Sequence, residues 1–366
     1  MNETHIQLPF YESEARKKEK RSCNILLIVN PVSGRMKTKT GLFEILDELY
    51  RLPSDDTTAK NITRAGPATA LPLPFGNLTN MTLGGDPSPD RRVTVVPTMY
   101  RGHATQMAAT AFKYGFDTVI CCGGDGTLNE TISGILTNPE ENRPILGYIP
   151  AGSTNDFAAS IGLSSSLRGA ARTAVGDVEM ALDVGFFRPV GGEAYPSRYF
   201  SYIASFGAFT AASYSTSQTA KNIFGHVAYL LEGVKDLTNL VPRRASFLLE
   251  NGSRCEGEYV FGAITNTTSA GGVFKLPSDR VSMSDGLFEL FLVHHPRTPA
   301  DLNKIATALL SQDFDNCPLI ELHHTRSVKV LMEENLSWSL DGEEAIAGTQ
   351  IDISCLPGAV TIRVNE

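Results

Sequence analysis

The chain has 366 residues, of which 42% are hydrophobic and 20% charged, so it can bury the cores of two ordinary domains. With a net charge of -8, the chain has no overall positive charge to neutralise the phosphates of a nucleic acid, which excludes nucleic acid as the main partner. A short basic run at 16–21 is either a solvated segment or a weak contact for anionic lipid headgroups.

The six cysteines, at positions 23, 121, 122, 255, 317 and 355, have neither zinc-ligand nor disulfide-framework spacing. We expect buried reduced thiols, which indicates a cytoplasmic location. Residues 1–10 lack the apolar core of a signal peptide, and no apolar run reaches the about 18 residues that span a bilayer. A lipid substrate would therefore be reached by peripheral association with a membrane.

Apolar runs and amphipathic stretches alternate through the first half of the chain. This pattern predicts strands at 24–29, 92–96, 118–120 and 145–149 and helices at 40–50, 104–114 and 129–136. Residues 53–91 are rich in Pro, Gly, Thr, Asn and Asp, which predicts a long loop insertion. The alternation predicts a parallel sheet with helices on both faces, in which ligands bind beyond the carboxyl ends of the strands.

The second half is rich in short β segments separated by Gly, Pro and Asn turns. Strands are predicted at 199–204, 245–249, 259–265, 287–293, 327–332 and 350–354, and helices at 220–237 and 299–311. We therefore expect an α/β domain with a parallel sheet at 22–165 and a β-rich, mainly antiparallel domain at 166–366.

The turn Gly123-Gly124-Asp125-Gly126-Thr127, continued by Leu128-Asn129-Glu130, follows a predicted strand and opens a helix. Glycines let a backbone approach an anion closely, and a helix N-terminus offers free N–H groups to phosphate. Asp125 would repel phosphate unless a metal ion or a hydroxyl group lies between them. The turn therefore predicts phosphoryl transfer.

Three further loops follow predicted strands and could converge with this turn. Asn30-Pro31-Val32-Ser33-Gly34-Arg35 can cradle phosphate through hydroxyl and backbone N–H groups, although an ordinary turn explains it equally well. Gly152-Ser153-Thr154-Asn155-Asp156 suits a ligand as well as an N-cap by Thr154 or Asn155. Thr98 is a candidate for phosphate or ribose contact, and by itself it is typical of a turn.

Other polar groups lie in the second half. Asp183 falls near the expected domain junction, and the loop from Leu276 to Asp285 offers oxygen ligands for a hard cation, or is a hairpin loop. Asp341-Gly342-Glu343-Glu344 reads as a hairpin turn or as an acidic site. The pairs His294-His295 and His323-His324 show no metal-ligand spacing with a carboxylate partner, so we expect surface or strand-end histidines.

Together, Asn30-Pro-x-Ser-Gly34, Gly123-Gly-Asp-Gly-Thr127-x-Asn-Glu130 and Gly152-x-x-Asn-Asp-Phe157-Ala158 resemble the diacylglycerol kinase catalytic-domain family. This family includes bacterial soluble lipid kinases and is related to the sphingosine kinases. The resemblance covers about residues 24–345 and implies an NAD kinase/phosphofructokinase-like α/β domain, a β-rich domain and a cleft between them. The insertion at 53–91 has no counterpart in the compact bacterial enzymes.

The resemblance also implies ligand sites. ATP would contact the loop from Asn30 to Arg35, Thr98, the turn from Gly123 to Glu130, Ser153, Asn155 and Asp156. A structural magnesium site would use Asp279 with the carbonyl groups of Leu276 and Val281, in a loop that is longer than the usual bacterial pattern. Asp341 and Glu343 match carboxylates with general-base or magnesium-network duties, and Asp183 matches a further acid of that network.

We therefore expect an ATP- and Mg2+-dependent lipid kinase that phosphorylates a lipid hydroxyl, with diacylglycerol as the first expectation. The alternatives are a sphingoid base or another lipid alcohol as acceptor, an NAD-kinase-like enzyme with a soluble substrate, and a non-catalytic nucleotide- or lipid-binding protein. Intact acids at 125, 183, 341 and 343 argue against the last alternative. Asp125, Asp341 and Glu343 remain competing general bases, and a homodimer remains open.

Overall fold

The computed structural model describes residues 23–50, 91–191, 195–208, 240–270 and 274–365. The basic run at 16–21 and the expected helix at 220–237 lie outside these residues. So does the expected insertion at 53–91, except for residue 91, which begins a strand.

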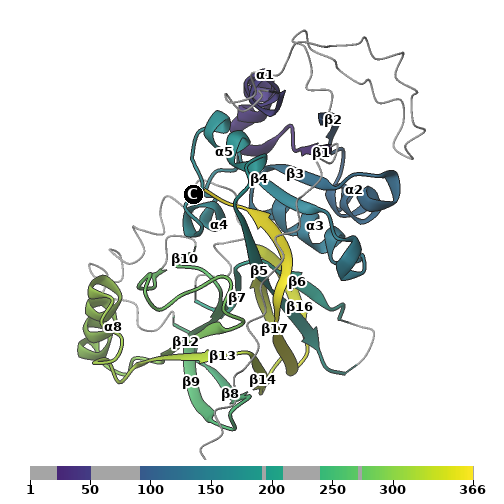
Figure 1. Cartoon of the computed structure of the whole chain (residues 1–366). Helices are drawn as coiled ribbons and strands as arrows, with labels where there is room; N and C mark the ends of the chain where they lie inside the picture. The colour runs from purple at the N-terminus through teal and green to yellow at the C-terminus, as the bar shows by residue number, and fades with distance from the viewer. Residues whose placement is uncertain (1–22, 51–90, 192–194, 209–239, 271–273, 366) are drawn as a thin grey trace, which may run out of the picture.

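A parallel sheet forms the first half, in the strand order β4-β3-β1-β2 (Figure 1). Its strands are β1 (Cys23–Val29), β2 (Arg91–Pro97), β3 (Thr118–Gly123) and β4 (Ile145–Pro150). The helical elements are η1 (Ser33–Met36), α1 (Lys37–Tyr50), α2 (His103–Ala111), η2 (Phe112–Tyr114), α3 (Asp125–Ile135), η3 (Glu140–Asn142), α4 (Asp156–Ser160) and α5 (Leu167–Ala174). The predicted parallel α/β half is confirmed.

Residues of β1 alternate between two cores because successive side chains of a strand point to opposite faces. Ile25 and Leu27 belong to the core that includes buried residues of α1 and α5. Leu26 and Ile28 belong to the core that includes buried residues of α2 and α3. The sheet is thus covered on both faces, and its strands direct their carboxyl ends to one edge.

Two local predictions differ from the structure. The helix expected from Asn129 begins at Asp125, because α3 starts directly after the extended backbone of Gly124. The single strand expected at 199–204 is split into β6 (Arg198–Phe200) and β7 (Ile203–Gly207). The intervening pair, Ser201 and Tyr202, bonds to a buried carboxylate described below and leaves the sheet at this point.

The β-rich second half is mainly antiparallel, as predicted. Besides β6 and β7, its strands are β5 (Glu179–Pro189), β8 (Arg243–Leu249), β9 (Arg254–Thr265), β10 (Ser269–Ala270), β11 (Phe274–Lys275), β12 (Phe288–His294), β13 (Ile320–Thr325), β14 (Ser327–Met332), β15 (Leu336–Leu340), β16 (Glu343–Ala347) and β17 (Gln350–Arg363). The expected helix at 299–311 is present as α8 (Pro299–Ser311), which begins with a capping box of Thr298 and Asp301.

The last strand, β17, joins the two halves. Ile362 of β17 pairs in parallel with Leu146 of β4, and the same strand pairs antiparallel with β5 and β14. The hydrogen-bonded path therefore continues from the parallel strands into the β-rich half (Figure 1). One core of the β-rich half includes Trp338, Phe206 and Phe247, whereas Phe261 and Phe291 belong to the core that also holds residues of α2 and α3.

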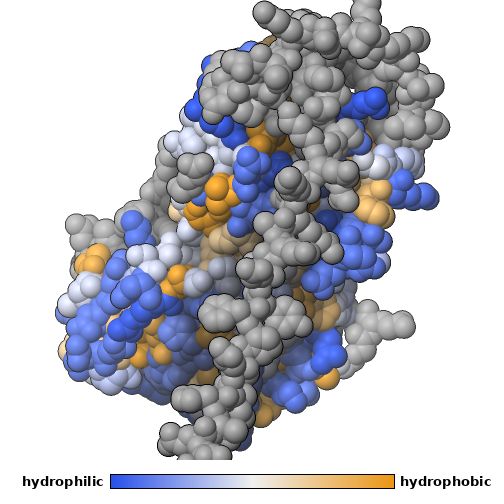
Figure 2. All heavy atoms as spheres, viewed as in Figure 1, coloured by the Kyte–Doolittle hydropathy of each residue, from blue (hydrophilic) through white to orange (hydrophobic). Residues whose placement is uncertain are grey.

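The visible described surface is largely hydrophilic, with smaller hydrophobic areas between (Figure 2). Within the described residues, none of the helices is both long and apolar enough to cross a membrane. Five cysteines (121, 122, 255, 317 and 355) are free and buried, as expected for reduced thiols.

Candidate active site

The three glycine-containing loops meet at the carboxyl ends of the parallel strands. A Cβ atom on Gly34 would lie 2.0 Å from the carbonyl oxygen of Ala151, and Gly34 has a φ of +53° that favours glycine. A Cβ on Gly152 would lie 2.6 Å from Cα of Gly124. The loops thus touch backbone to backbone, which only residues without a side chain allow, and the predicted convergence is observed.

Polar contacts link the same loops. Nδ2 of Asn30 donates a 2.9 Å hydrogen bond to Oγ1 of Thr127. Oγ of Ser33 lies near Gly124, 3.5 Å from where a Cβ of that residue would be. The backbone N–H of Thr98 donates to the carbonyl of Val29 at 2.8 Å, which places the end of β2 beside the end of β1. Pro31 lies between Asn30 and Ser33 in the first loop, and Arg35 belongs to η1.

Asp125 stands at the first turn of α3, partly buried. Burial, together with the charges of Asp156 and Asp341, raises its pKa to about 7, although backbone N–H groups of Asp156 and Phe157 oppose the shift by hydrogen bonding. Its Oδ1 atom is buried and accepts no hydrogen bond from the described residues. An orphaned carboxylate oxygen beside other acids fits a divalent cation or a hydroxyl donor.

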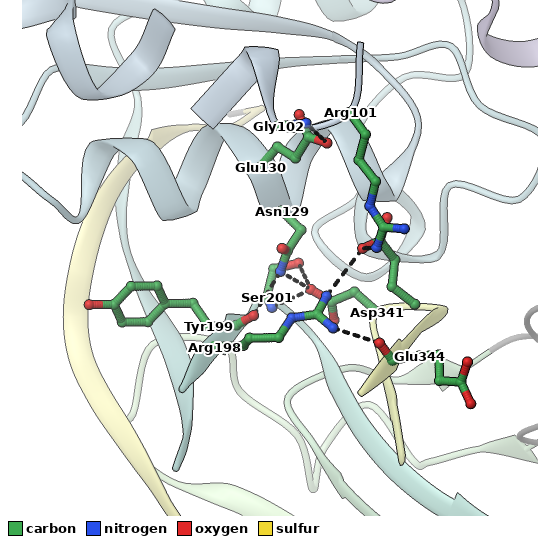
Figure 3. A network of polar contacts seen from close by, with 10 residues as sticks. Arg101, Gly102, Asn129, Glu130, Arg198, Tyr199, Ser201, Asp341 and Glu344 are labelled. Atoms are coloured by element: carbon green, nitrogen blue, oxygen red, sulfur yellow. Dashed lines mark hydrogen bonds and ion pairs between the residues drawn. The ribbon is translucent and has the colours of Figure 1, made fainter. Parts of the chain in front are cut away.

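Asp341 is 4% exposed and ties the two halves together (Figure 3). Its Oδ2 accepts hydrogen bonds from Nδ2 of Asn129 (2.7 Å) and from the backbone N–H (2.6 Å) and hydroxyl (2.7 Å) of Ser201. Its Oδ1 accepts from the N–H groups of Tyr202 and Ile203, both at 3.1 Å. Burial raises the pKa of Asp341, and these five donors counteract the shift by stabilising the carboxylate.

The turn that carries Asp341 is a two-residue hairpin between β15 and β16, as one of the two sequence interpretations had it. Asp341 and Gly342 both have positive φ, 50° and 83°, which is the geometry of a type I′ turn. The turn places Glu343 over the start of α3, since a Cβ on Gly126 would lie 3.6 Å from Oε1 of Glu343.

Glu343 is held by two arginines. Its Oε2 lies 2.5 Å from Nη2 of Arg101 and 3.1 Å from Nη2 of Arg198, and its side chain is 32% exposed. Arg198 also donates to the backbone carbonyl of Glu344 at 2.7 Å (Figure 3). Unlike Asp341, Glu343 is open to solvent and to a ligand at this edge.

Glu130 and Asn155, both expected to contact ATP, hold parts of the protein in place instead. Glu130 accepts from the backbone N–H groups of Gly102 (2.8 Å) and Ala104 (3.3 Å), so it caps the start of α2. Asn155 is the N-cap residue of α4, but its side chain makes no capping bond. It clamps Gly152 instead, through bonds of 2.9 and 3.1 Å to that residue's N–H and carbonyl groups. Ser153 is exposed at the surface of this loop.

Asp183 bonds to a different set of loops. Its two oxygens accept from the N–H groups of Gly286 (2.6 Å) and Gly358 (2.7 Å), and burial raises its pKa. The same residue's N–H donates to the carbonyl of Met283. Asp183 therefore supports the 276–286 loop, while its bonds do not extend to Asp125 or Asp341.

The loop between β11 and β12 contains the three expected metal ligands. Leu276 is buried, at 3% exposure, whereas Asp279 is exposed to solvent. Val281 packs against the main core. The magnesium assignment to these three residues stays a prediction.

Sequence reasoning missed Arg101, Arg198 and Ser201, which complete the network around Asp341 and Glu343 (Figure 3). None of them lies in a motif, and each is brought to the site by chain segments far away in sequence. Of the three, only Arg101 has a local signal in the sequence, because it follows Thr98 in the same loop. Loop residues beyond a parallel strand commonly reach the ligand site.

Comparison with known proteins gives two family matches. Residues 88–187 match the model of the diacylglycerol kinase catalytic domain. Residues 203–364 match the YegS C-terminal NAD kinase beta sandwich-like domain. The two matches fall on the α/β half and on the β-rich half.

Curated relatives agree with these matches. A diacylglycerol kinase of Bacillus subtilis (strain 168) is 35% identical over 243 residues, covering 66% of this chain and 76% of the relative. A diacylglycerol kinase of Staphylococcus haemolyticus (strain JCSC1435) is 31% identical over 243 residues, covering 66% and 69%.

The fold is shared with a crystal structure of a diacylglycerol kinase from Bacillus anthracis str. Sterne. The TM-score is 0.62 at 21% identity, covering 95% of this chain and 98% of that chain. A further structure from the same strain reaches a TM-score of 0.68 at 22% identity, covering 95% and 99%. From the sequence identity, the coverage and the two domain matches, we conclude that this chain belongs to the diacylglycerol kinase family.

Proposed function

We propose that the protein transfers the γ-phosphoryl group of ATP to the hydroxyl group of a lipid, with diacylglycerol as the acceptor. The observation that supports this most directly is the contact of the Gly34, Gly124 and Gly152 loops beside Asp125. Such a site presents backbone N–H groups and the start of α3 to phosphates. The names of the relatives supply the acceptor class.

The donor site is assigned to the loop from Asn30 to Arg35, Thr98, the turn from Gly123 to Asn129, and Ser153. Asn155 and Glu130 act on this site by holding the Gly152 loop and the start of α2. Asn30 and Asn129 also bond to the protein, through Thr127 and Asp341, so we assign the phosphate-facing surface chiefly to the backbone of the glycine loops.

Magnesium fits the site because Asp125 has a buried oxygen without a protein donor, next to the charge of Asp156. A bound ion would neutralise phosphate charge there and favour the ionised form of the Asp125 carboxyl group. A second, structural magnesium at Leu276, Asp279 and Val281 belongs to the same proposal.

For the general base we favour Asp125 over its two competitors. Its pKa of about 7 suits proton transfer near neutral pH. Asp341 already accepts five hydrogen bonds and is buried, so we assign it the positioning of the β6–β7 turn against α3. Glu343, with its two arginines, is assigned to binding the reacting phosphates or the acceptor.

The lipid acceptor would be reached at a membrane surface. Large apolar side chains are exposed on the loops that follow β1 and β2, at Val32 (71%), Met99 (77%) and Tyr100 (54%). These side chains could enter the headgroup region beside the donor site. The proposal therefore includes peripheral contact with membranes in the cytoplasm.

The test is incubation of the full chain with ATP labelled in its γ-phosphate and with vesicles that contain diacylglycerol, a sphingoid base or neither. We expect magnesium-dependent labelling of phosphatidic acid, identified by its mass. Labelling of the sphingoid base would move the acceptor to that class, and labelling of added NAD without vesicles would support a soluble-substrate kinase. ATP binding without any labelled product would support a non-catalytic role.

A further inference from the structure

The β-rich half contains a second polar cluster, at β9, β12 and β13, made of Cys255, His294, Glu321 and His323. His294 lies at the end of β12, as expected of a strand-end histidine. His294 and His323 both bond to Glu321, a carboxylate partner that the spacing of the histidines did not indicate. The three strands that hold the cluster are hydrogen-bonded neighbours, and they lie away from α2 and α3 (Figure 1).

The strand register brings the four side chains to one face. Glu321 and His323 are two residues apart on β13, so they project from the same side of that strand. Leu290 and Leu292 of β12 pair with His323 and Glu321, and β9 pairs with the other edge of β12. Because pairing crosses three strands, residues separated by more than sixty positions in the sequence come into contact.

We propose that Cys255, Glu321 and His323 form a zinc site, with a fourth position left for water or another ligand. One donor atom from each of the three residues lies within 4.8 Å of the others. The set of one sulfur, one imidazole nitrogen and one carboxylate oxygen is typical of zinc and matches the softer divalent metals, rather than the all-oxygen set of magnesium.

The distances match the edges of a tetrahedral zinc site. With Zn–S of about 2.3 Å and Zn–N of about 2.05 Å, the sulfur–nitrogen edge is about 3.5 Å. Here Sγ of Cys255 and Nε2 of His323 lie 3.4 Å apart. The corresponding nitrogen–oxygen edge is about 3.3 Å, and Nε2 of His323 lies 3.0 Å from Oε2 of Glu321.

Two neighbouring residues, His294 and Tyr259, orient the carboxylate of Glu321 by bonding to its other oxygen. Nε2 of His294 lies 2.7 Å from Oε1 of Glu321, and the hydroxyl of Tyr259 donates to the same oxygen at 3.2 Å. Oε2 is thereby directed at His323 and Cys255. Outer partners of this kind fix the ligands of protein metal sites.

Gly257 borders the cluster on one side, and the partly exposed side chains of Glu321 and His323 open it to solvent on another. Gly257 lies between Cys255 and Tyr259, and a Cβ there would come within 3.2 Å of the His294 ring, so glycine makes the room for that imidazole. Cys255 is 7% exposed, whereas the side chains of Glu321 and His323 are 25% and 36% exposed. An ion can therefore enter from the His323 side. As the Zn–S bond forms, the thiol proton of Cys255 passes to the buffer.

The test uses the full chain, freed of metal with a chelator and titrated with Co2+ and then with Zn2+. We expect one Co2+ per chain, with a thiolate-to-cobalt charge-transfer band in the near ultraviolet that zinc abolishes. Cys255→Ser should remove the band, and His323→Gln should weaken Zn2+ binding by more than about 100-fold. His294→Gln, which acts through Glu321, should weaken binding by about 10- to 100-fold.

The controls are Cys317→Ser, a buried cysteine elsewhere, and His324→Gln, on the opposite face of β13. Both should bind Co2+ as the parent chain does. His323→Gln alters a half-exposed side chain and remains informative if Cys255→Ser fails to fold. The proposal is overturned if the parent chain shows no cobalt–thiolate band, or if His323→Gln binds Zn2+ with unchanged affinity; the cluster is then a metal-free hydrogen-bond network around Glu321.

Discussion

Nδ2 of Asn129 donates a 2.7 Å hydrogen bond to Oδ2 of Asp341, which joins the first turns of α3 to the β15–β16 hairpin. Asn129 lies six residues after Gly123, whereas Asp341 lies more than two hundred residues further along the chain. The contact links the two halves of the molecule, in addition to the pairing of β17 with β4.

Asp341→Asn should lower the free energy of unfolding by about 2–4 kcal/mol, because an amide nitrogen would face N–H donors in a buried site. Urea unfolding followed by circular dichroism measures the change. Asp315→Asn is the matched control, since Asp315 forms only a surface pair with Arg280 and should cost less than about 1 kcal/mol. Equal stability of the two variants would contradict the positioning role of Asp341.

Asp125→Asn should reduce turnover by about 10²- to 10⁴-fold, the usual contribution of a general base. In the parent enzyme kcat/KM should fall as pH drops through about 7, because the carboxylate is then protonated. Higher magnesium concentration should move this limb to lower pH, since a nearby cation favours the charged form. A pH profile of the variant that keeps the same limb would exclude Asp125 as its source.

Glu343→Gln should leave the free energy of unfolding within about 1 kcal/mol, because its pairs with Arg101 and Arg198 are partly exposed. Phosphoryl transfer should nevertheless fall if the side chain binds the reacting groups. Steady-state kinetics with varied ATP and varied lipid separate the two substrates. Glu344→Gln, at the adjacent position and bonded to Ser337, is the control and should keep full activity.

Gly152→Ala should raise the KM for ATP, because the new Cβ would lie 2.6 Å from Cα of Gly124 and force the two loops apart. ATP affinity measured by calorimetry tests the same point without turnover. Gly176→Ala is a suitable control, since the nearest atom to its Cβ would be 3.2 Å away and outside the site. Unchanged ATP affinity in Gly152→Ala would show that the loop contact does not shape the donor site.

Glu289→Gln should remove part of the stability loss at alkaline pH. Burial raises the pKa of Glu289 from 4.5 to about 8, and neither oxygen has a hydrogen-bond partner among the described residues. Between pH 4.5 and about 8, the folded state therefore holds a proton that the unfolded state releases. The contribution of Glu289 to the free energy of unfolding is complete below pH 4.5 and is lost as pH rises through about 8.

The measurement is urea unfolding of parent and variant at several pH values. The parent should lose more stability than Glu289→Gln between acid and alkaline pH, by an amount on the order of 2 kcal/mol. Glu333→Gln, at a mostly exposed position, should follow the parent curve. Identical curves for the parent and Glu289→Gln would mean that Glu289 is not titrating in this range.

Much of the first half could be predicted from local sequence. The continuous apolar run from Ile25 to Val29 is typical of a strand buried on both faces, and the glycine turns allow close approach to another backbone or to a ligand. The convergence of the loops followed because parallel strands place their carboxyl ends at one edge. The division of the chain at 165 remains a prediction, and the pairing of β17 with β4 was not foreseen.

The sequence by itself determined that the glycine loops meet, because a Cβ atom on Gly34 or Gly152 would clash with the backbone of a neighbouring loop. Which acids act, and how, was decided by the tertiary structure. Asp125 and Asp341 are both aspartates in acidic turns, yet one keeps an unpartnered oxygen and the other accepts five hydrogen bonds. Burial and donors from distant segments set these states, as they set the contact of Cys255 with His323, and no local pattern encodes them.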